Sequence, residues 1–533
     1  MPNGFSLFPL LAPLAFYAAS ALSAWQSGRA SRALNLVARC ASALSLFCAA
    51  LLAFYVSREG ALTTPSLVMQ GVGLSLRLDA LSTVMFSLVS ILGALVLRYS
   101  RTYLEGDTRH GAFLGAMCAT IASVLLLVLA GNVLLLVLAW MATGTSLCRL
   151  LLFSPERAGA KLAARKTWIV ARFGDLCFAA AAFCLWQTLG TLDIATLGER
   201  ASEFTGQSAP RSLHLATFLL AFGAIWKSAQ FPTSAWLLDV IETPTPVSAL
   251  LHAGILNGGT FTLVRLSHAL TASPSAMHLL IVVGASTALL ASIAMTSQSS
   301  IKASLAYSSA AHMGFMLMLC GLGAFSVAIL HLVAHSFYKA HAFLSSGGIV
   351  DSARAPKAAA PPQESKLSLF GIGVLLALAL FMGVALALGV SLSSNLVSLA
   401  LGAVLVMGLS YLLAQALHQR GGWRVCKHAL LSATTTTLAF FVLELAATRL
   451  LGSVLPLPSA PGQSTLALMF LVVAAFSTAI FAQAFMPRWK ASRLGQAAYV
   501  HFRQGLYSPL LFDRLIATDR PSDQNQAHQE ISR

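Results

Sequence analysis

The chain has 533 residues, of which 57% are hydrophobic and only 10% are charged. Soluble domains carry about 25% charged residues, so this composition excludes an ordinary soluble protein. The net charge of +16 is divided unevenly between the two sides of a predicted membrane topology, which favours a topology signal over nucleic-acid binding.

Apolar runs long enough to cross a hydrocarbon core of about 30 Å recur along the whole sequence. The predicted fold class is an all-α integral membrane protein with about fifteen transmembrane helices. The first run lacks a basic leader and a cleavage pattern, so we interpret it as a retained span. The predicted spans are 5–25, 33–55, 79–97, 112–130, 132–153, 166–190, 212–230, 246–271, 277–296, 303–320, 324–349, 367–388, 392–417, 428–450 and 464–486.

Basic residues follow the positive-inside rule if the first span begins outside. The connections from odd to even spans and the C-terminal tail then hold 25 of the 34 lysines and arginines, and the opposite side holds 6. This bias predicts a multi-pass protein of the bacterial inner membrane, with its N-terminus periplasmic and its C-terminus cytoplasmic.

The eight cysteines are scattered over five predicted spans and one connection, without a CxxC pair or a Cys/His cluster. They indicate neither a disulfide framework nor a zinc or iron–sulfur site. Glycine-rich nucleotide loops are also missing, so we predict no metal and no cofactor on this chain and assign it no catalytic residues.

Ionisable residues inside the spans are informative, because one at bilayer depth costs about 2.5–3.5 kcal/mol on insertion scales. The first pair in chain order is Arg172 and Asp175, three residues apart, which can neutralise each other in a mainly structural role. Glu444 is alone in a later span with Arg449 one turn away. It either extends a proton relay or pairs with an arginine.

Lys227 lies about fifteen residues into an apolar helix and five residues before Pro232. A proline removes a backbone donor and breaks a helix, and transporters place ion sites at breaks in mid-membrane. A lysine held in apolar surroundings can release and regain a proton near neutral pH. We interpret Lys227 as a proton carrier; the alternative is a lysine that snorkels from a helix end.

Asp239 and Glu242 follow in WLLDVIETPTPVSALLHAG. They are three residues apart and share one face of a helix. Pro244 and Pro246 predict a short half-helix, then a bend, then a full span. The two carboxylates either collect protons at the cytoplasmic mouth or are ordinary interfacial charges at a helix terminus.

The strongest group of titratable residues is in HLVAHSFYKAH, where His331, His335 and Lys339 are spaced four residues apart. They form one polar stripe, about 12 Å long, on an apolar helix. A row of this kind suits stepwise proton transfer, and His252 in an earlier span can relay protons too. The alternative for each is a structural residue satisfied by helix–helix hydrogen bonds. His341 points elsewhere.

Three segments carry a resemblance to a known family: WKSAQFPTSAWLLDVIETPTPVSALLHAG, QSSIKASLAYSSAAHMGFMLMLCG and LHLVAHSFYKAHAFLSSG. They resemble the proton-translocating antiporter-like membrane subunits, which include subunit L of NADH-quinone oxidoreductase, the large Na⁺/H⁺ antiporter subunits and the DabB group of inorganic-carbon pumps. The match is dense from about 212 to 349. It implies two inverted five-helix repeats and broken helices in spans 7 and 11, near Pro232 and near Gly321–Gly323 or further along span 11.

The resemblance also implies roles for individual residues. Lys227 is the central protonatable lysine, and Asp239 and Glu242 stand near the entrance of the proton pathway. The polar axis is formed by His252, His331, His335 and Lys339.

Two departures separate the chain from the respiratory subunits. Those subunits have a glutamate after the tryptophan of span 5, where this chain has Met141 after Trp140. They also carry a lysine motif in span 12, where this chain has LSLFGIGVLLALALFMGVALALG. The same features resemble the DabB group, which implies proton or other cation flow coupled to CO₂ hydration in a large soluble zinc-binding partner of the DabA type.

The predicted organisation has four parts: peripheral helices over 1–110, an antiporter-like core over 111–366, further spans over 367–486, and a tail over 487–533. The tail sequence FRQGLYSPLLFDRL is compatible with an interfacial amphipathic helix. Two alternative functions stay open, a proton-pumping subunit of an NADH-quinone oxidoreductase-like complex and a Na⁺/H⁺ antiporter subunit.

Overall fold

The structure is a computed structural model of the chain. It describes residues 4–25, 28, 30–65, 74–204, 209–348, 366–390, 396–418, 422–456, 460–489 and 491–515. Within these ranges the protein is helical throughout, apart from short turns and a two-stranded antiparallel ribbon of β1 (Leu62–Thr63) and β2 (Arg77–Leu78).

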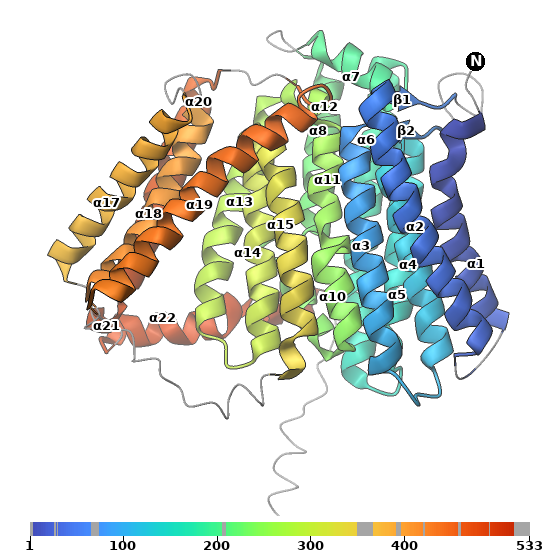
Figure 1. Cartoon of the computed structure of the whole chain (residues 1–533), viewed down its shortest axis with the longest axis horizontal. Helices are drawn as coiled ribbons and strands as arrows, with labels where there is room; N and C mark the ends of the chain where they lie inside the picture. The colour runs from blue at the N-terminus through green and yellow to red at the C-terminus, as the bar shows by residue number, and fades with distance from the viewer. Residues whose placement is uncertain are drawn as a thin grey trace, which may run out of the picture.

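The helices run in chain order from the dark blue N-terminal end to the red C-terminal end in Figure 1. The first part comprises η1 (Gly4–Leu10), α1 (Leu11–Trp25), α2 (Arg32–Glu59), α3 (Ala80–Tyr103), α4 (His110–Leu129), α5 (Val133–Leu151), α6 (Ala158–Leu189) and α7 (Ile194–Ser202). The central part comprises α8 (Arg211–Lys227), α9 (Ala235–Asp239), η2 (Val240–Glu242), α10 (Thr245–Ala253), η3 (Ile255–Asn257), α11 (Gly258–Arg265), α12 (Ser267–Thr271), α13 (Pro274–Thr296), α14 (Ile301–Gly321), α15 (Phe325–Leu344) and η4 (Ser346–Gly348). The last part comprises α17 (Leu367–Ala387), α18 (Leu396–His418), α19 (Gly422–Leu451), α20 (Gln463–Ala484), α21 (Met486–Trp489), α22 (Arg493–Arg503), η6 (Gly505–Tyr507) and α23 (Ser508–Leu515).

Thirteen helical stretches in the described ranges are long and apolar enough to cross a membrane. The predicted all-α membrane fold is therefore confirmed. The two further segments that the sequence predicts as spans are α8, which has 17 residues, and α15. They carry Lys227 and the His331–Lys339 row. The total of fifteen spans and the inverted repeats stay predictions.

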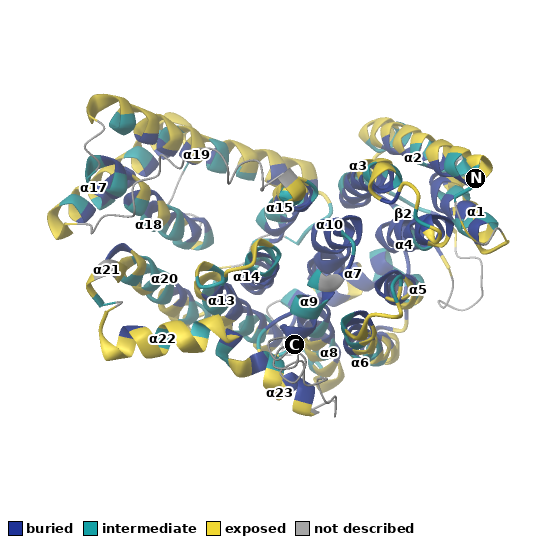
Figure 2. Ribbon diagram, turned by 90° about the horizontal axis from the view of Figure 1, so that it is seen from below, coloured by how far each residue is buried: buried dark blue, intermediate teal, exposed yellow. Residues whose placement is uncertain are grey.

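Burial divides the helices into a centre and a periphery. The apolar windows of α4 and of the α10–α11 stretch are 83% and 94% buried, whereas those of α19 and α20 are 17% and 11% buried. Figure 2 shows the same contrast between dark blue α10 and α4 and the largely yellow α19. Because lipid tails are as apolar as leucine, the exposed faces of peripheral helices suit a bilayer.

Two central spans are broken. After α8 the chain leaves helical geometry over 228–234 and resumes as the short α9, which confirms the predicted break near Pro232. A second break, which the sequence analysis missed, separates α10 from α11 at Gly254. The predicted break in span 11 is wrong for the described residues. Helix α15 is continuous over Phe325–Leu344, a stretch that contains neither proline nor glycine. Gly321 is the last residue of α14, and Gly323, with φ +76°, lies in the turn between the two helices.

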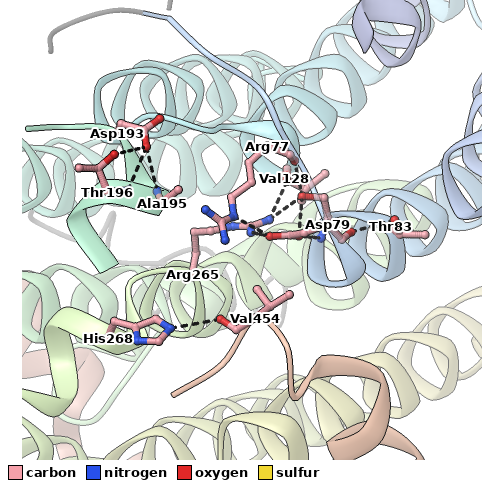
Figure 3. A network of polar contacts seen from close by, with 11 residues as sticks. Arg77, Asp79, Thr83, Val128, Asp193, Ala195, Thr196, Arg265, His268 and Val454 are labelled. Carbon is pink, nitrogen blue, oxygen red and sulfur yellow. Dashed lines mark hydrogen bonds and ion pairs between the residues drawn. The ribbon is translucent and has the colours of Figure 1, made fainter. Parts of the chain in front are cut away.

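A buried charge network joins the ends of α3 and α11 near β2 (Figure 3). Arg265 donates to Asp79 from 2.6 Å and to the Ser82 hydroxyl from 2.7 Å, and Arg77 donates to the same Asp79 carboxylate from 2.8 Å. Asp79 also accepts from the Ser82 backbone N–H and so caps α3. The network therefore fastens the N-terminal helices to the central ones.

We expect Asp79→Ala to destabilise the protein by about 3–5 kcal/mol, because it leaves the buried Arg265 without its carboxylate. Thermal unfolding of the purified chain in detergent measures the change. The matched control is Asp107→Asn, which removes a carboxylate from a surface turn and is expected to have little effect. Equal stability of the two variants would contradict this role of Asp79.

Candidate functional site

The side chain of Lys227 is held against Asp175 on the neighbouring helix α6. Its Nζ donates to Asp175 Oδ1 from 2.6 Å, and the lysine and aspartate side chains are only 4% and 5% exposed. Arg172 forms an ion pair with the other oxygen, Oδ2, at 2.8 Å. One carboxylate therefore serves two cations. The predicted Arg172–Asp175 pair is confirmed, but Asp175 is also the partner of the candidate proton carrier.

Local structure explains why Lys227 is tolerated at this depth. It is the last residue of α8, where the helix dipole favours a cation. Its stem lies on Gly174, at which a Cβ atom would come within 2.8 Å of the Lys227 Cγ atom. The ammonium also stands over the Trp140 ring, 4.3 Å from its centroid, a favourable cation–π position.

The side chain of Met141 takes no part in this cluster, and the residue is 39% exposed. Only its carbonyl oxygen contributes, by accepting from Arg172 at 3.3 Å. A methionine side chain at position 141 cannot supply an acidic partner to Lys227. In the structure Asp175, one helix further along the chain, supplies that partner.

The break after Lys227 keeps its polar backbone satisfied. The Gln230 amide donates to the Ser228 carbonyl, the Thr233 hydroxyl donates to the Gln230 carbonyl, and the Phe231 N–H donates to the Thr287 hydroxyl. Such substitutes are what allow non-helical backbone inside a membrane protein. The break is thus a built feature beside Lys227.

A second cluster contains three imidazoles. His331 and His335 of α15 meet His312 of α14, and one ring nitrogen from each of the three lies within 4.8 Å of the others. His312 Nδ1 and His331 Nε2 are 2.9 Å apart, so they share a hydrogen bond. His335 is 4% exposed, and neither of its ring nitrogens has a protein partner among the described residues.

Lys339 is fully buried one turn beyond His335 on α15. Its Nζ donates to the Leu305 carbonyl of α14 from 3.0 Å. Among the residues that the structure describes, no carboxylate lies within ion-pair distance of it, in contrast to Lys227. His341, on the same helix, is exposed.

His252 lies at the end of α10 and is 1% exposed. Its ring stacks on Phe343 of α15 at 4.4 Å between centroids, and its Nδ1 has no protein partner in the described ranges. The last two turns of α15 therefore carry both Lys339 and the ring that supports His252. No direct hydrogen bond in these ranges joins this region to Lys227.

The two predicted entrance carboxylates have different positions. Asp239, at the end of α9, accepts from the buried Lys166 of α6 at 2.5 Å. Lys166 also pairs with Asp513 of α23. Glu242 ends η2, and its side chain lies outside the described residues. In the peripheral spans, Glu444 accepts a hydrogen bond from Ser398, so Ser398 is a polar partner of this carboxyl group.

The three histidines are the one cluster in the described ranges with a spacing suited to a metal ion. A divalent ion there would add two charges, and the cluster offers no carboxylate to offset them. Burying unpaired charge is costly, and neutral imidazoles can exchange protons, which is the role that the sequence predicts for His331 and His335. His312 was not predicted as a site residue, although an ionisable side chain in an apolar helix is the signal that could have found it.

Comparisons with known proteins assign the chain to a family. Residues 130–417 match the model described as "NADH:quinone oxidoreductase/Mrp antiporter, TM". Residues 69–114 match the model for the N-terminus of chain 5 of NADH-ubiquinone oxidoreductase, complex I.

Curated relatives extend the match. The chain is 34% identical over 452 residues to the probable inorganic carbon transporter subunit DabB2 of Halothiobacillus neapolitanus, covering 83% of this chain and 80% of that protein. It is 40% identical to the probable subunit DabB of Hydrogenovibrio crunogenus, over 53% of this chain and 55% of that one. It is 39% identical to subunit L of the NADH-quinone oxidoreductase of Escherichia coli, over 52% of this chain and 46% of that one.

A solved structure supports the fold. The Mrp complex from Dietzia sp. DQ12-45-1b matches with a TM-score of 0.60 and 24% identity, over 98% of this chain and 62% of that chain.

Proposed function

From the premise that the chain belongs to the NADH:quinone oxidoreductase/Mrp antiporter family of membrane subunits, we propose that it conducts protons for an inorganic-carbon accumulation complex. The observation that carries the proposal is the Lys227–Asp175–Arg172 cluster. It holds a titratable ammonium beside a helix break in a membrane span. Retaining such a residue in lipid is costly and marks an ion pathway.

The route that we propose uses Lys227, His252, His335, His331 and Lys339, with Asp239 and Glu242 near its entrance. Among the described residues, several buried side-chain atoms on or next to the helices of this route have no protein partner: Ser228 Oγ, Ser248 Oγ, His252 Nδ1, Thr260 Oγ1 and both nitrogens of His335. Buried polar groups of this kind are normally satisfied by ordered water. Water between them would link the lysines, and the histidines would pass protons at physiological pH.

The proposal assigns the carbon chemistry to another chain. The relatives are named as the DabB and DabB2 subunits of inorganic carbon transporters. Their names imply a partner subunit, which we propose is a large soluble DabA-like chain. We propose that this partner holds a zinc ion and hydrates CO₂ to bicarbonate, because zinc-bound water is a strong nucleophile at neutral pH. Cation flow through the membrane subunit would make the hydration directional.

Growth in ordinary air tests the proposed function. The chain is expressed with and without its DabA-like neighbour in a bacterium that lacks carbonic anhydrase. We expect growth only when both chains are present. Failure of the pair to restore growth, with both proteins detected in the membrane fraction, would contradict the proposal.

The identity to subunit L supports a second candidate, the proton-pumping arm of an NADH-quinone oxidoreductase-like complex. Purification distinguishes the two, because that complex would bring quinone-reducing activity with the chain. The Mrp likeness concerns the fold alone. A Na⁺/H⁺ antiporter would show sodium-dependent proton flux in vesicles, and proton flux that is independent of sodium would argue against it.

A further inference from the structure

The C-terminal segment forms a strap across one end of the helix bundle. Helix α22 lies flat along the lower edge of Figure 1, nearly perpendicular to the membrane helices. Figure 2 shows the strap from below, running from α21 beside α20, past α13, to α23 beside α9. Segments separated by more than 250 residues in the sequence, α9 and α23, are therefore neighbours.

The strap is fixed at its middle. Gln298 donates to the Arg503 carbonyl at the end of α22. Gly505 follows in a left-handed conformation, with φ +59°, and a Cβ atom at this position would come within 2.2 Å of the Tyr307 hydroxyl. Glycine is therefore favoured both by the backbone conformation and by the close approach to α14. Phe512 then buries its ring, at 3% exposure.

A charge cluster fixes the far end of the strap. Lys166 of α6 is 0% exposed and lies between two carboxylates, Asp239 of α9 and Asp513 of α23. A buried ammonium needs such partners, since an unpaired charge in the interior is costly. The single lysine therefore ties three elements together: a full-length span, the half-helix that follows the Lys227 break, and the C-terminal helix.

We propose that α23 positions the half-helix α9 through this cluster, with Asp513 as a positioning residue. The proposal rests on the proposed function, because α9 joins the Lys227 break to the expected entrance at Asp239. Asp513 neutralises part of the positive charge of Lys166, and this ion pair keeps α23 packed against α9. Asp239 is thereby held in one orientation at the foot of the route.

Hydrogen exchange, measured by mass spectrometry on the full-length chain in lipid nanodiscs, tests the positioning directly. In Asp513→Asn we expect amides in 235–243 to exchange about tenfold faster, because the ion pair between Asp513 and Lys166 is lost. Asp513→Glu, which keeps the charge, restores slow exchange. The matched control is Arg514→Gln, an exposed neighbour on the same helix, which leaves exchange at α9 unchanged.

A second readout separates positioning from simple docking of the tail. Growth in air with the partner chain is expected to fall in Asp513→Asn and to recover in Asp513→Glu. Faster exchange confined to 505–515, with α9 and growth unchanged, would overturn the proposal. Hydrogen exchange is measured without transport, so it tests the positioning role separately from the proposed function. If the wild-type chain and its partner fail to restore growth, only the proposed function is contradicted.

Discussion

Lys227→Arg is expected to abolish proton flux although it keeps a positive charge beside Asp175. A guanidinium stays protonated under all physiological conditions, so it can pair with the carboxylate but cannot pass a proton on. If Lys227 transfers protons, flux should fall by about a hundredfold or more, the usual contribution of a positioned acid or base. A purely electrostatic role would be preserved in this variant.

Proteoliposomes that contain a pH-sensitive dye measure the flux, with the partner subunit present. Lys227→Met should be equally inactive yet remain folded, because Asp175 keeps its 2.8 Å pair with Arg172. Lys161→Arg is the control, since Lys161 is an exposed lysine on α6. Wild-type flux in Lys227→Arg would remove proton transfer at this residue from the mechanism.

The sequence was a good guide wherever one residue breaks a rule of its surroundings. A lysine and a proline inside an apolar run predicted the break after α8, because both the missing donor and the buried charge demand local structure. The break at Gly254 was missed since a single glycine among apolar residues is common in membrane helices. Span 11 was predicted to break from family resemblance alone, and its helix lacks a residue that would break it.

Partners of buried charges were harder to predict than the charges themselves. Asp175 is 52 positions from Lys227 in the sequence, and its spacing to Arg172 suggested a self-contained pair. The interaction of Lys166 with Asp513 spans almost two thirds of the chain. Such contacts depend on which helices are neighbours in space. Helix periodicity predicts which residues share a face, but it does not predict which helix packs against that face.

Lys339→Met is expected to separate conduction from stability, because this lysine has no ion-pair partner among the described residues. In the part of the chain that the structure describes, its only hydrogen bond is to the Leu305 carbonyl, which also accepts from the Ser309 hydroxyl. Removal of the ammonium therefore leaves no unsatisfied group, and an apolar side chain of similar length should cost no stability. Proton flux, in contrast, should be lost.

Lys339→Arg gives the opposite stability with the same loss of flux. Its charge cannot be neutralised, and an unpaired buried charge should destabilise the protein by several kcal/mol. Thermal unfolding in detergent should therefore rank Met at or above Lys, and Lys above Arg, while His341→Ala on the exposed face changes neither property. Full flux in Lys339→Met would remove the α15 row from the route. An arginine variant as stable as wild type would show that the site already solvates a permanent charge, and a lysine there would then have no reason to give up its proton.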